Sequence, residues 1–267
     1  MKLINKIYTG LIFAFLYAPI IVMVVFSFNN SRSRTVWKGF TLNWYRELFR
    51  DDEILNSLYL TLIVAALASI IATVIGTLAA IGFNSMNKRM RSALMTINNI
   101  PMVNPEIVTG VSLMLLFVFV FKMTGLLQPG FATLLLAHIT FNIPYVILSV
   151  LPKLRQMNAS LYEAALDLGC PPLQAFFKVV LPEISPGIIT GMMMAFTMSL
   201  DDFVISYFTS GSTAQTLSMT IYSMTKKRVS PKINALSTLL FVTVLILLIL
   251  VNVRQNREES KYKKGLK

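Results

Sequence analysis

Residues 157–185 read MNASLYEAALDLGCPPLQAFFKVVLPEIS, and the local chemistry of this segment predicts a short helix followed by a sharp turn. Ser160 and Glu163 have the spacing of a capping box, in which each side chain satisfies a free backbone N–H of the other residue. The helix should run through YEAALDL and end at Gly169, because glycine accepts the left-handed conformation that follows many helix C-termini. We therefore expect the segment to begin with a helix and a turn.

The second half of the same segment predicts another short helix. Pro171 and Pro172 suit a first helical turn, where their missing N–H groups cost nothing. Pro182 is expected to end this pattern before the next apolar stretch. Small residues at Ala164 and Ala165 would let a partner surface approach the first helix closely. The expected structure is helix, turn, helix, lying outside a bilayer.

The remainder of the chain has the composition of a polytopic membrane protein. Of its 267 residues, 55% are hydrophobic and 13% are charged, with a mean hydropathy of +0.67. Soluble domains carry about 25% charged residues, and one bilayer crossing takes about 20 apolar residues as helix. We expect an all-α bundle that forms one transmembrane domain over residues 1–267, including the 157–185 loop. Its six predicted spans are about 8–28, 57–83, 100–122, 130–151, 186–208 and 233–253.

The charges predict the orientation of these spans. The net charge of +12 lies mostly in short loops and the tail, so it indicates membrane topology rather than a nucleic-acid partner. Both termini and the loops 84–99 and 152–185 are expected in the cytoplasm, although Lys226, Lys227 and Arg228 on the outer side oppose this bias. The first apolar run lacks a small-residue cleavage site and is expected to be retained. The aromatic and charged residues of segment 36–49 favour an interfacial helix.

Small residues recur at spacings of three or four positions in two of the predicted spans. One set is Gly187, Gly191 and Ala195, in the fifth span. The second span carries a similar set, Ala65, Ser69, Ala72, Gly76 and Ala80. This spacing lets helix backbones approach closely, so we expect these residues at helix–helix contacts.

The 157–185 segment resembles the EAA loop of ABC-importer permeases, a motif written EAA, three residues, G, nine residues, I-x-L-P. The only departure is a valine in place of the isoleucine. In that family the loop is a coupling helix that docks in a groove of the ATPase subunit, although Glu163 could equally serve only as a helix cap. The resemblance implies an ATPase-coupling role for the matching residues, Glu163, Ala164, Ala165, Gly169, Val179, Leu181 and Pro182.

The resemblance extends over nearly the whole chain to the spermidine/putrescine branch of these permeases. The stretches that carry it are VNPEIVTGVSLMLLF (103–117), AHITFNIP (137–144), FTMSLDDFVISYF (196–208) and IYSMTKKRVSPKINAL (221–236). It implies a polyamine importer in the inner membrane of a bacterium. Expected partners are an ABC ATPase dimer, a second permease subunit, an extracytoplasmic polyamine-binding protein and membrane lipid, with ATP and magnesium bound by the ATPase and no cofactor in this chain.

Three acids lie in or near the predicted spans: Glu106, Asp201 and Asp202. An aspartate at the centre of a membrane helix costs about 2.5–3.5 kcal/mol, so such residues normally face the bundle interior or water. On a continuous helix Asp202 shares a stripe with small and polar residues, which favours it as a cavity wall, and Asp201 is expected to pair with a neighbouring helix.

A polyamine is complemented by carboxylates and aromatic faces, so Phe203, Tyr207 and Tyr222 are predicted companions of these acids. The alternative is that one or both aspartates sit at the outer helix end and bond to backbone or solvent. Glu106 follows Pro105 and is either a first-turn residue or part of the exit path.

Several functional classes are disfavoured by what the sequence lacks. It contains no G-x-x-x-x-G-K-[ST] phosphate loop and no catalytic or metal-binding set, so ATP hydrolysis is expected in a partner and no enzyme activity here. The lone histidine, His138, is expected to be an interior residue, and the lone cysteine, Cys170, excludes an internal disulfide. Two alternatives stay open: a permease for another small solute, and a proton-coupled transporter or pore.

Overall fold

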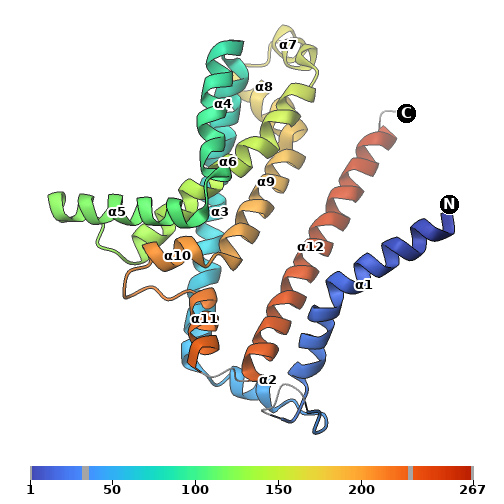
Figure 1. Cartoon of the computed structure of the whole chain (residues 1–267). Coiled ribbons are helices and arrows are strands. Elements are labelled where there is room, and N and C mark those ends of the chain that lie inside the picture. Colours follow the sequence, from blue (N-terminus) through green and yellow to red (C-terminus); the bar gives the residue numbers. More distant parts are fainter. Residues whose placement is uncertain (1, 32–35, 228–230, 266–267) are drawn as a thin grey trace. The chain divides into compact units, whose positions relative to one another are not determined.

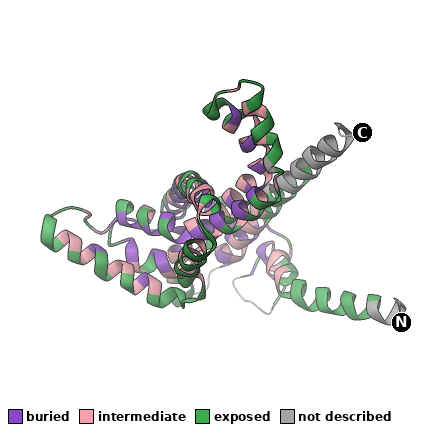
Figure 2. Cartoon of the chain, turned by 90° about the horizontal axis from the view of Figure 1, so that it is seen from above, coloured by how far each residue is buried: buried purple, intermediate pink, exposed green. Residues whose placement is uncertain are grey.

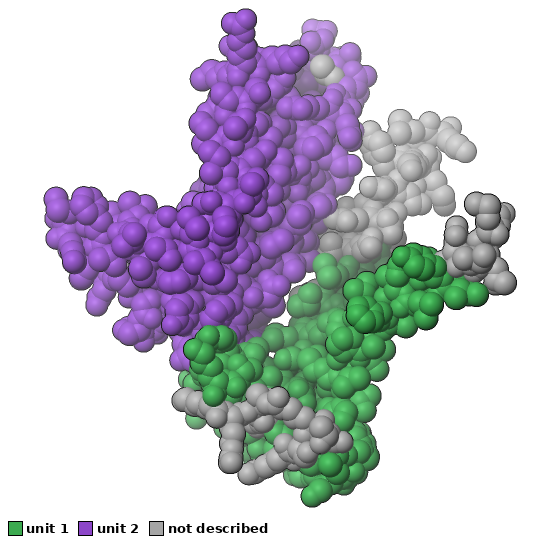
Figure 3. Space-filling model, in the orientation of Figure 1, with its two compact units in different colours: residues 1–56, 220–267 green, residues 57–219 purple. Residues whose placement is uncertain are grey.

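The computed structural model describes residues 2–31, 36–227 and 231–265, and the regular elements of these residues are helical (Figure 1). An isolated bridge joins Asn29 to Phe40. The all-α fold class predicted from the sequence is therefore confirmed. The chain forms two compact units, residues 1–56 with 220–267 and residues 57–219, which are coloured separately in Figure 3.

Five helices in the described residues are long and apolar enough to cross a membrane. They lie in α1 (Lys2–Ser27), α3 (Asp52–Ser85), α5 (Glu106–Thr124), α6 (Phe131–Gln156) and the continuous helix Pro172–Asp201 that ends with α9 (Leu181–Asp201). The sixth predicted span falls in α12 (Pro231–Gly265), where Pro231–Ile246 is a shorter apolar helix.

The third predicted span begins later than expected, and the loop before it is mostly helical. Residues 84–99 were expected to be a loop, but α4 (Lys88–Val103) occupies most of them and is capped by the Asn87 side chain, which accepts the Met90 N–H at 2.9 Å. Asn104 is extended, with ψ 139°, and α5 starts at Glu106. Pro105 explains this break, because a residue before proline is pushed away from the helical region.

Unit 1 contains a compact polar turn built on the buried Asn29. Its Nδ2 donates to the Val36 carbonyl at 2.8 Å, its Oδ1 accepts the Lys38 N–H at 2.9 Å, and its carbonyl accepts the Trp44 Nε1–H at 2.8 Å. The helix predicted in this segment is α2 (Asn43–Leu48). Lys232 on α12 lies 3.4 Å from Glu47 and 3.5 Å from Asp51.

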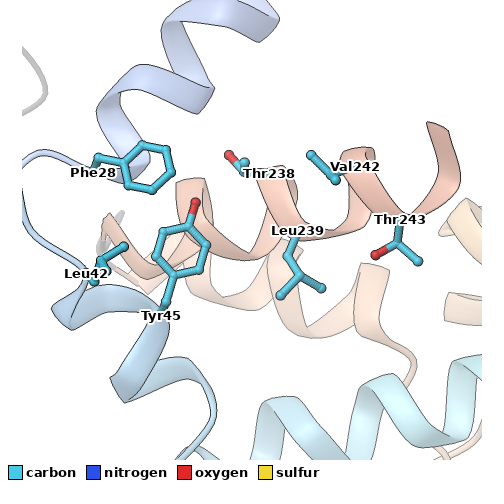
Figure 4. A pocket seen from close by; sticks show the side chains of 7 residues that line it. All are labelled: Phe28, Leu42, Tyr45, Thr238, Leu239, Val242 and Thr243. Atoms are coloured by element: carbon cyan, nitrogen blue, oxygen red, sulfur yellow. The ribbon is translucent and has the colours of Figure 1, made fainter. Parts of the chain in front are cut away.

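An apolar hollow of about 320 Å³ opens in unit 1 between α2, α12 and the end of α1 (Figure 4). Phe28 and Tyr45 stand on one side of it, with ring centroids 5.3 Å apart. The remaining lining residues are Leu42, Thr238, Leu239, Val242 and Thr243. None of the lining residues is acidic, so the hollow does not provide the carboxylates that a polyamine requires.

The core of unit 2 is the contact between α6 and α9. Val146, Ile147 and Val150 of α6 are buried in one cluster with Ile184 and Ala195 of α9. Close approach depends on glycine: a Cβ at Gly76 of α3 would lie 2.7 Å from the Val146 Cβ. Ala65, Ala72 and Ala80 on α3 are fully buried, which agrees with the small-residue spacing read from the sequence.

Candidate translocation site and coupling loop

The apolar helix of the fifth predicted span breaks at the aspartate pair. We expected it to run unbroken from 186 to 208, but α9 ends at Asp201 and a separate helix, α10, spans Val204–Thr209. Asp202 is extended between them, with φ −59° and ψ 128°. Its carboxylate accepts the backbone N–H of Ile205 at 3.3 Å and of Ser206 at 2.7 Å, so it caps the start of α10.

Polar side chains of α6 meet this break in the interior. His138 Nε2 lies 3.1 Å from the Ser206 hydroxyl and 3.5 Å from Asp202 Oδ2. One turn further along α6, Asn142 donates to the Ser199 hydroxyl at 2.7 Å. The five residues His138, Asn142, Ser199, Asp202 and Ser206 form a buried polar seam between α6 and the α9–α10 break. His138 is thus an interior residue, as the sequence predicted.

Helix α10 is fixed by further contacts with α5 and α6. At its C-terminal end, the Thr209 carbonyl accepts a hydrogen bond of 2.7 Å from the Thr133 hydroxyl of α6. On its other side, a Cβ at Gly110 of α5 would lie 3.0 Å from the Phe208 ring and 3.5 Å from the Val204 carbonyl. Figure 1 shows α10 beside α5 within unit 2. The short helix is therefore held at both ends.

Asp201, Phe203 and Tyr207, which the sequence analysis predicted for the substrate pathway, lie next to the break between α9 and α10. The Asp201 side chain is exposed, while its backbone carbonyl accepts the Ser218 hydroxyl at 3.3 Å. Phe203 and Tyr207 bring their ring centroids within 5.5 Å, and Tyr207 is 54% exposed. A carboxylate and two aromatic rings are thus contributed by the same short stretch of chain.

Asp202 was predicted to line a cavity because it shares one helical stripe with small and polar residues. The structure shows this stripe to be packed rather than open. Gly191, Ala195 and Ser199 are buried, and the Asp202 side chain is only 5% exposed, because this face of α9 packs on α6. The argument also assumed a continuous helix, which ends at Asp201. Which aspartate contacts a substrate stays a prediction.

The other predicted pathway residues, Glu106 and Tyr222, belong to other helices than the break. Glu106 is exposed in the first turn of α5, one helical turn before Gly110. Tyr222 lies on α11 (Leu217–Lys227) in the part of that helix assigned to unit 1. The Lys226 ammonium lies 4.8 Å from the Tyr222 ring centroid, a cation–π contact.

The predicted packing glycines of α9 face α6. A Cβ at Gly187 would lie 2.9 Å from the Ser149 carbonyl oxygen, and one at Gly191 would lie 3.1 Å from the Val146 Cα. Ala195 is fully buried. These residues occupy the α6–α9 contact and do not line an open path.

The loop at 157–185 has the predicted turn with a different helix cap. The helix α7 spans Ala159–Asp167, and its cap is Asn158, whose side chain accepts the Ser160 N–H at 3.0 Å. The capping box of Ser160 and Glu163 was therefore wrong, because the helix starts before Ser160. Glu163 is exposed, as is Ala164.

The turn after α7 is a Schellman motif. The Gly169 N–H bonds to the Leu166 carbonyl at 2.9 Å and the Cys170 N–H to the Ala165 carbonyl at 3.0 Å. Gly169 has φ +82°, the left-handed value predicted for it. The turn leaves Leu168 89% exposed.

The second helix of the loop continues directly into the membrane helix. Pro172 opens α8 (Pro172–Ala175), as predicted, and a π-helical turn, η1 (Phe176–Val180), leads into α9. The Leu181 N–H bonds five residues back to the Phe176 carbonyl, so the missing N–H of Pro182 falls in the first turn of α9. Pro182 was wrongly expected to end the helix. Val179 and Leu181 are half-buried at this junction.

Sequence reasoning missed the polar seam. Its signal was the spacing of His138 and Asn142, four residues apart on one face of a helix. The partners Ser199, Asp202 and Ser206 could not be assigned without knowing which helices pack together. Within the described residues, no group of three or more His, Cys, Asp or Glu side chains could hold a metal ion.

Five helices long and apolar enough to cross a membrane indicate a multi-pass membrane protein. Residues 72–263 match the family described as the inner membrane component of binding-protein-dependent transport systems. The chain belongs to this family.

Curated relatives are similar over most of their length. The chain is 43% identical to the putrescine transport system permease protein PotI of Escherichia coli K12 over 234 residues, 87% of this chain and 83% of PotI. It is 38% identical to the spermidine/putrescine transport system permease protein PotC of Haemophilus influenzae over 239 residues, 90% of this chain and 91% of PotC. The family resemblance read from the sequence is confirmed.

Solved structures show the same fold at low sequence identity. A subunit of a bacterial ABC transporter that imports alginate covers 96% of this chain and 95% of its own length, with a TM-score of 0.75 and 17% identity. The inward-facing MetNI methionine ABC transporter matches with a TM-score of 0.58 and 19% identity, covering 82% of this chain and 97% of that one. The permease fold predicted from the sequence is therefore confirmed.

Proposed function

We propose that the chain is a permease subunit of an ATP-driven importer that carries polyamines across the inner membrane. The observation that carries this proposal is the 43% identity to a putrescine permease over 87% of the chain. In this proposal the chain forms half of a pathway with a second permease subunit and performs no covalent chemistry. An extracytoplasmic binding protein delivers the polyamine, and a partner ATPase dimer binds ATP and magnesium.

The chemistry of the helix break supports a polyamine as the substrate. A flexible chain of ammonium groups requires carboxylates and aromatic faces, and exposed Asp201 stands beside Phe203 and Tyr207. Asp202, whose carboxylate accepts two backbone N–H groups of α10, adds a second carboxyl group at the break. Glu106 and Tyr222 are assigned to other parts of the path.

The loop at 157–185 supports coupling to an ATPase. Helix α7 exposes Glu163 and Ala164, and the Schellman turn exposes Leu168, so the loop presents a small and partly apolar surface. Val179, Leu181 and Pro182 join the loop to α9, whose other end is the aspartate break. A movement of α7 would thus be transmitted along one continuous helix, with both chain termini and this loop in the cytoplasm.

The test is uptake of labelled putrescine and spermidine by the complex reconstituted with its ATPase, sister permease and binding protein. Asp201→Asn should raise the KM for both polyamines by about tenfold or more, since tenfold corresponds to about 1.4 kcal/mol of lost attraction. The matched control is Asp52→Asn, an exposed aspartate in the first turn of α3, which should leave uptake unchanged.

Two results would contradict this function. If Asp201→Asn and Asp202→Asn both leave polyamine uptake unchanged, the substrate is not a polycation received at the break. If uptake persists without ATP and collapses when a protonophore is added, the chain is a proton-coupled transporter.

A further inference from the structure

We propose that His138 is a positioning residue for translocation, which acts through Asp202 and Ser206 to hold the α9–α10 break in place. The inference rests on the proposed function, since its consequence for transport is that Asp201 is presented to the substrate in one fixed geometry. His138 is buried and belongs neither to the coupling loop nor to the proposed substrate contacts, so the proposed function gives it no role. The inference supplies one.

The need for such a residue follows from the local sequence of the break. Residues 192–210 contain neither proline nor glycine, so no backbone restriction ends α9 at Asp201. Side-chain contacts must therefore stabilise the extended Asp202. Its carboxylate supplies one part of them by capping α10, but these two bonds are local to the break and do not join it to α6.

His138, on α6, contacts the capping carboxylate of Asp202. Its Nε2 lies 3.5 Å from Asp202 Oδ2 and 3.1 Å from the Ser206 hydroxyl. Asp202 is the residue at the break, and Ser206 belongs to α10. The side chains of His138 and Asp202 are only 2% and 5% exposed, so water does not compete for these contacts.

The arrangement of partners indicates which ring nitrogen carries the hydrogen. Nδ1 of His138 is buried and has no hydrogen-bond partner among the described residues. A neutral ring with its hydrogen on Nε2 donates to the Ser206 hydroxyl at 3.1 Å, with Asp202 Oδ2 nearby at 3.5 Å, and leaves only a lone pair unmatched at Nδ1. A hydrogen on Nδ1 would instead leave a buried N–H unpaired, which is costly. The ring therefore acts as an Nε2–H donor to the break.

The rest of α10 cannot move independently of this contact. Thr133 of α6 bonds to the Thr209 carbonyl at 2.7 Å, and Gly110 of α5 leaves room only for contact with Phe208 and the α10 backbone. Because these contacts remain without His138, its loss is expected to shift the connection between Asp201 and α10 rather than release the whole helix. Asp201 and Phe203 lie in this connection, and the Tyr207 ring lies 5.5 Å from the Phe203 ring, so all three proposed substrate contacts would be affected.

The experiment compares two replacements of His138 in the reconstituted complex. His138→Leu removes the donor at similar volume, and His138→Gln keeps an N–H donor at a reach close to that of Nε2. Thr140→Val is the matched control, because Thr140 is exposed on the same helix and its hydroxyl donates to the Leu136 carbonyl at 2.8 Å. The KM and maximal rate of putrescine uptake are measured per assembled complex.

A positioning role predicts that His138→Leu raises the KM by about tenfold, that His138→Gln restores most of the affinity, and that Thr140→Val changes neither value. The effect of His138→Leu on the KM should vanish when Asp201→Asn is also present, because both act on one contact. A lower amount of assembled complex with an unchanged KM would overturn the inference, since this result indicates a role in folding alone.

A second readout does not depend on the identity of the substrate. Tyr207→Cys, in a Cys170→Ser background, reports the environment of α10 through its rate of thiol labelling. His138→Leu should change this rate, whereas His138→Gln and Thr140→Val should not. If wild-type complex imports no polyamine but the labelling rates follow this pattern, the proposed function fails and the positioning of α10 stands; equal rates in every variant overturn the positioning itself.

Discussion

Asp201 and Asp202 are neighbours in the chain but have opposite surroundings. A lone aspartate at the centre of a membrane helix costs about 2.5–3.5 kcal/mol. The cost of Asp202 is offset by two backbone N–H groups and by His138, whereas Asp201 keeps an exposed carboxylate. One residue can therefore hold the break while the other remains available for a cation.

A single methyl group at Gly187 should destabilise the protein. Its Cβ would lie 2.9 Å from the Ser149 carbonyl oxygen, which belongs to the α6 backbone and cannot rotate away. Gly187→Ala is expected to cost about 1–3 kcal/mol, the range for overpacking a tight contact. The measurement is the thermal unfolding temperature of the purified protein in detergent.

Gly82→Ala is the matched control for this substitution. Gly82 also lies inside a helix, α3, but a Cβ there meets no atom within 4 Å. The alanine should leave stability equal or raise it by up to about 1 kcal/mol, through helix propensity alone. Equal unfolding temperatures for the two variants would show that the α6–α9 contact tolerates a side chain at Gly187.

At the scale of elements, the sequence predicted those helix boundaries that depend on neighbouring residues. The left-handed turn at Gly169 and the helix start at Pro172 are encoded by a few adjacent residues. The start of α5 after Pro105 has the same local origin, although we placed that span a few residues too early. Such signals act within one turn and need no knowledge of the tertiary fold.

The boundaries that the sequence did not predict depend on distant contacts. The end of α9 at Asp201 is stabilised by His138, whose hydrogen-bond partner Ser206 lies 68 residues further along the chain. Helix periodicity cannot identify such a partner, so the aspartates were placed on one continuous helix. For the same reason, the stripe that contains Gly191 was taken for a cavity wall when it is the face packed on α6.

The turn after α7 should be essential for coupling. Gly169→Ala places a Cβ on a residue with φ +82°, which costs roughly 1–2 kcal/mol and disfavours the Schellman turn. Since 1.4 kcal/mol is a factor of ten in an equilibrium, ATP-driven uptake should fall by about tenfold. The measurement is uptake and ATP hydrolysis by the reconstituted complex.

A substitution at a second glycine distinguishes the effect of backbone strain from the effect of lost ATPase coupling. Gly125, at the C-terminus of α5, has φ +71° and, like Gly169, no atom within 4 Å of an added Cβ. Gly125→Ala carries a similar strain outside the loop and should leave uptake per assembled complex unchanged. If both variants lose uptake equally, the effect of Gly169 is general strain and the coupling role of α7 is not supported.

At the scale of the whole molecule, many apolar side chains of the described residues are exposed. None of the apolar window of α1 is buried, and Figure 2 shows its described part as an almost uniformly exposed helix. Phe15, for example, is 82% exposed. In water such a surface would be strongly unfavourable, so lipid or another protein chain must cover it. This agrees with a helix that crosses a membrane.

The orientation of the molecule can be tested with its single native cysteine. Cys170 lies directly after the turn of the coupling loop and is half-buried, and the proposed orientation places it in the cytoplasm. A membrane-impermeant maleimide should therefore label it in inverted inner-membrane vesicles and not in intact spheroplasts. Leu126→Cys in a Cys170→Ser background should show the opposite pattern, because residue 126 is 67% exposed in the connection on the other side. Labelling of Cys170 from outside would place α7 away from cytoplasmic ATP, and ATPase coupling through this loop would then be impossible.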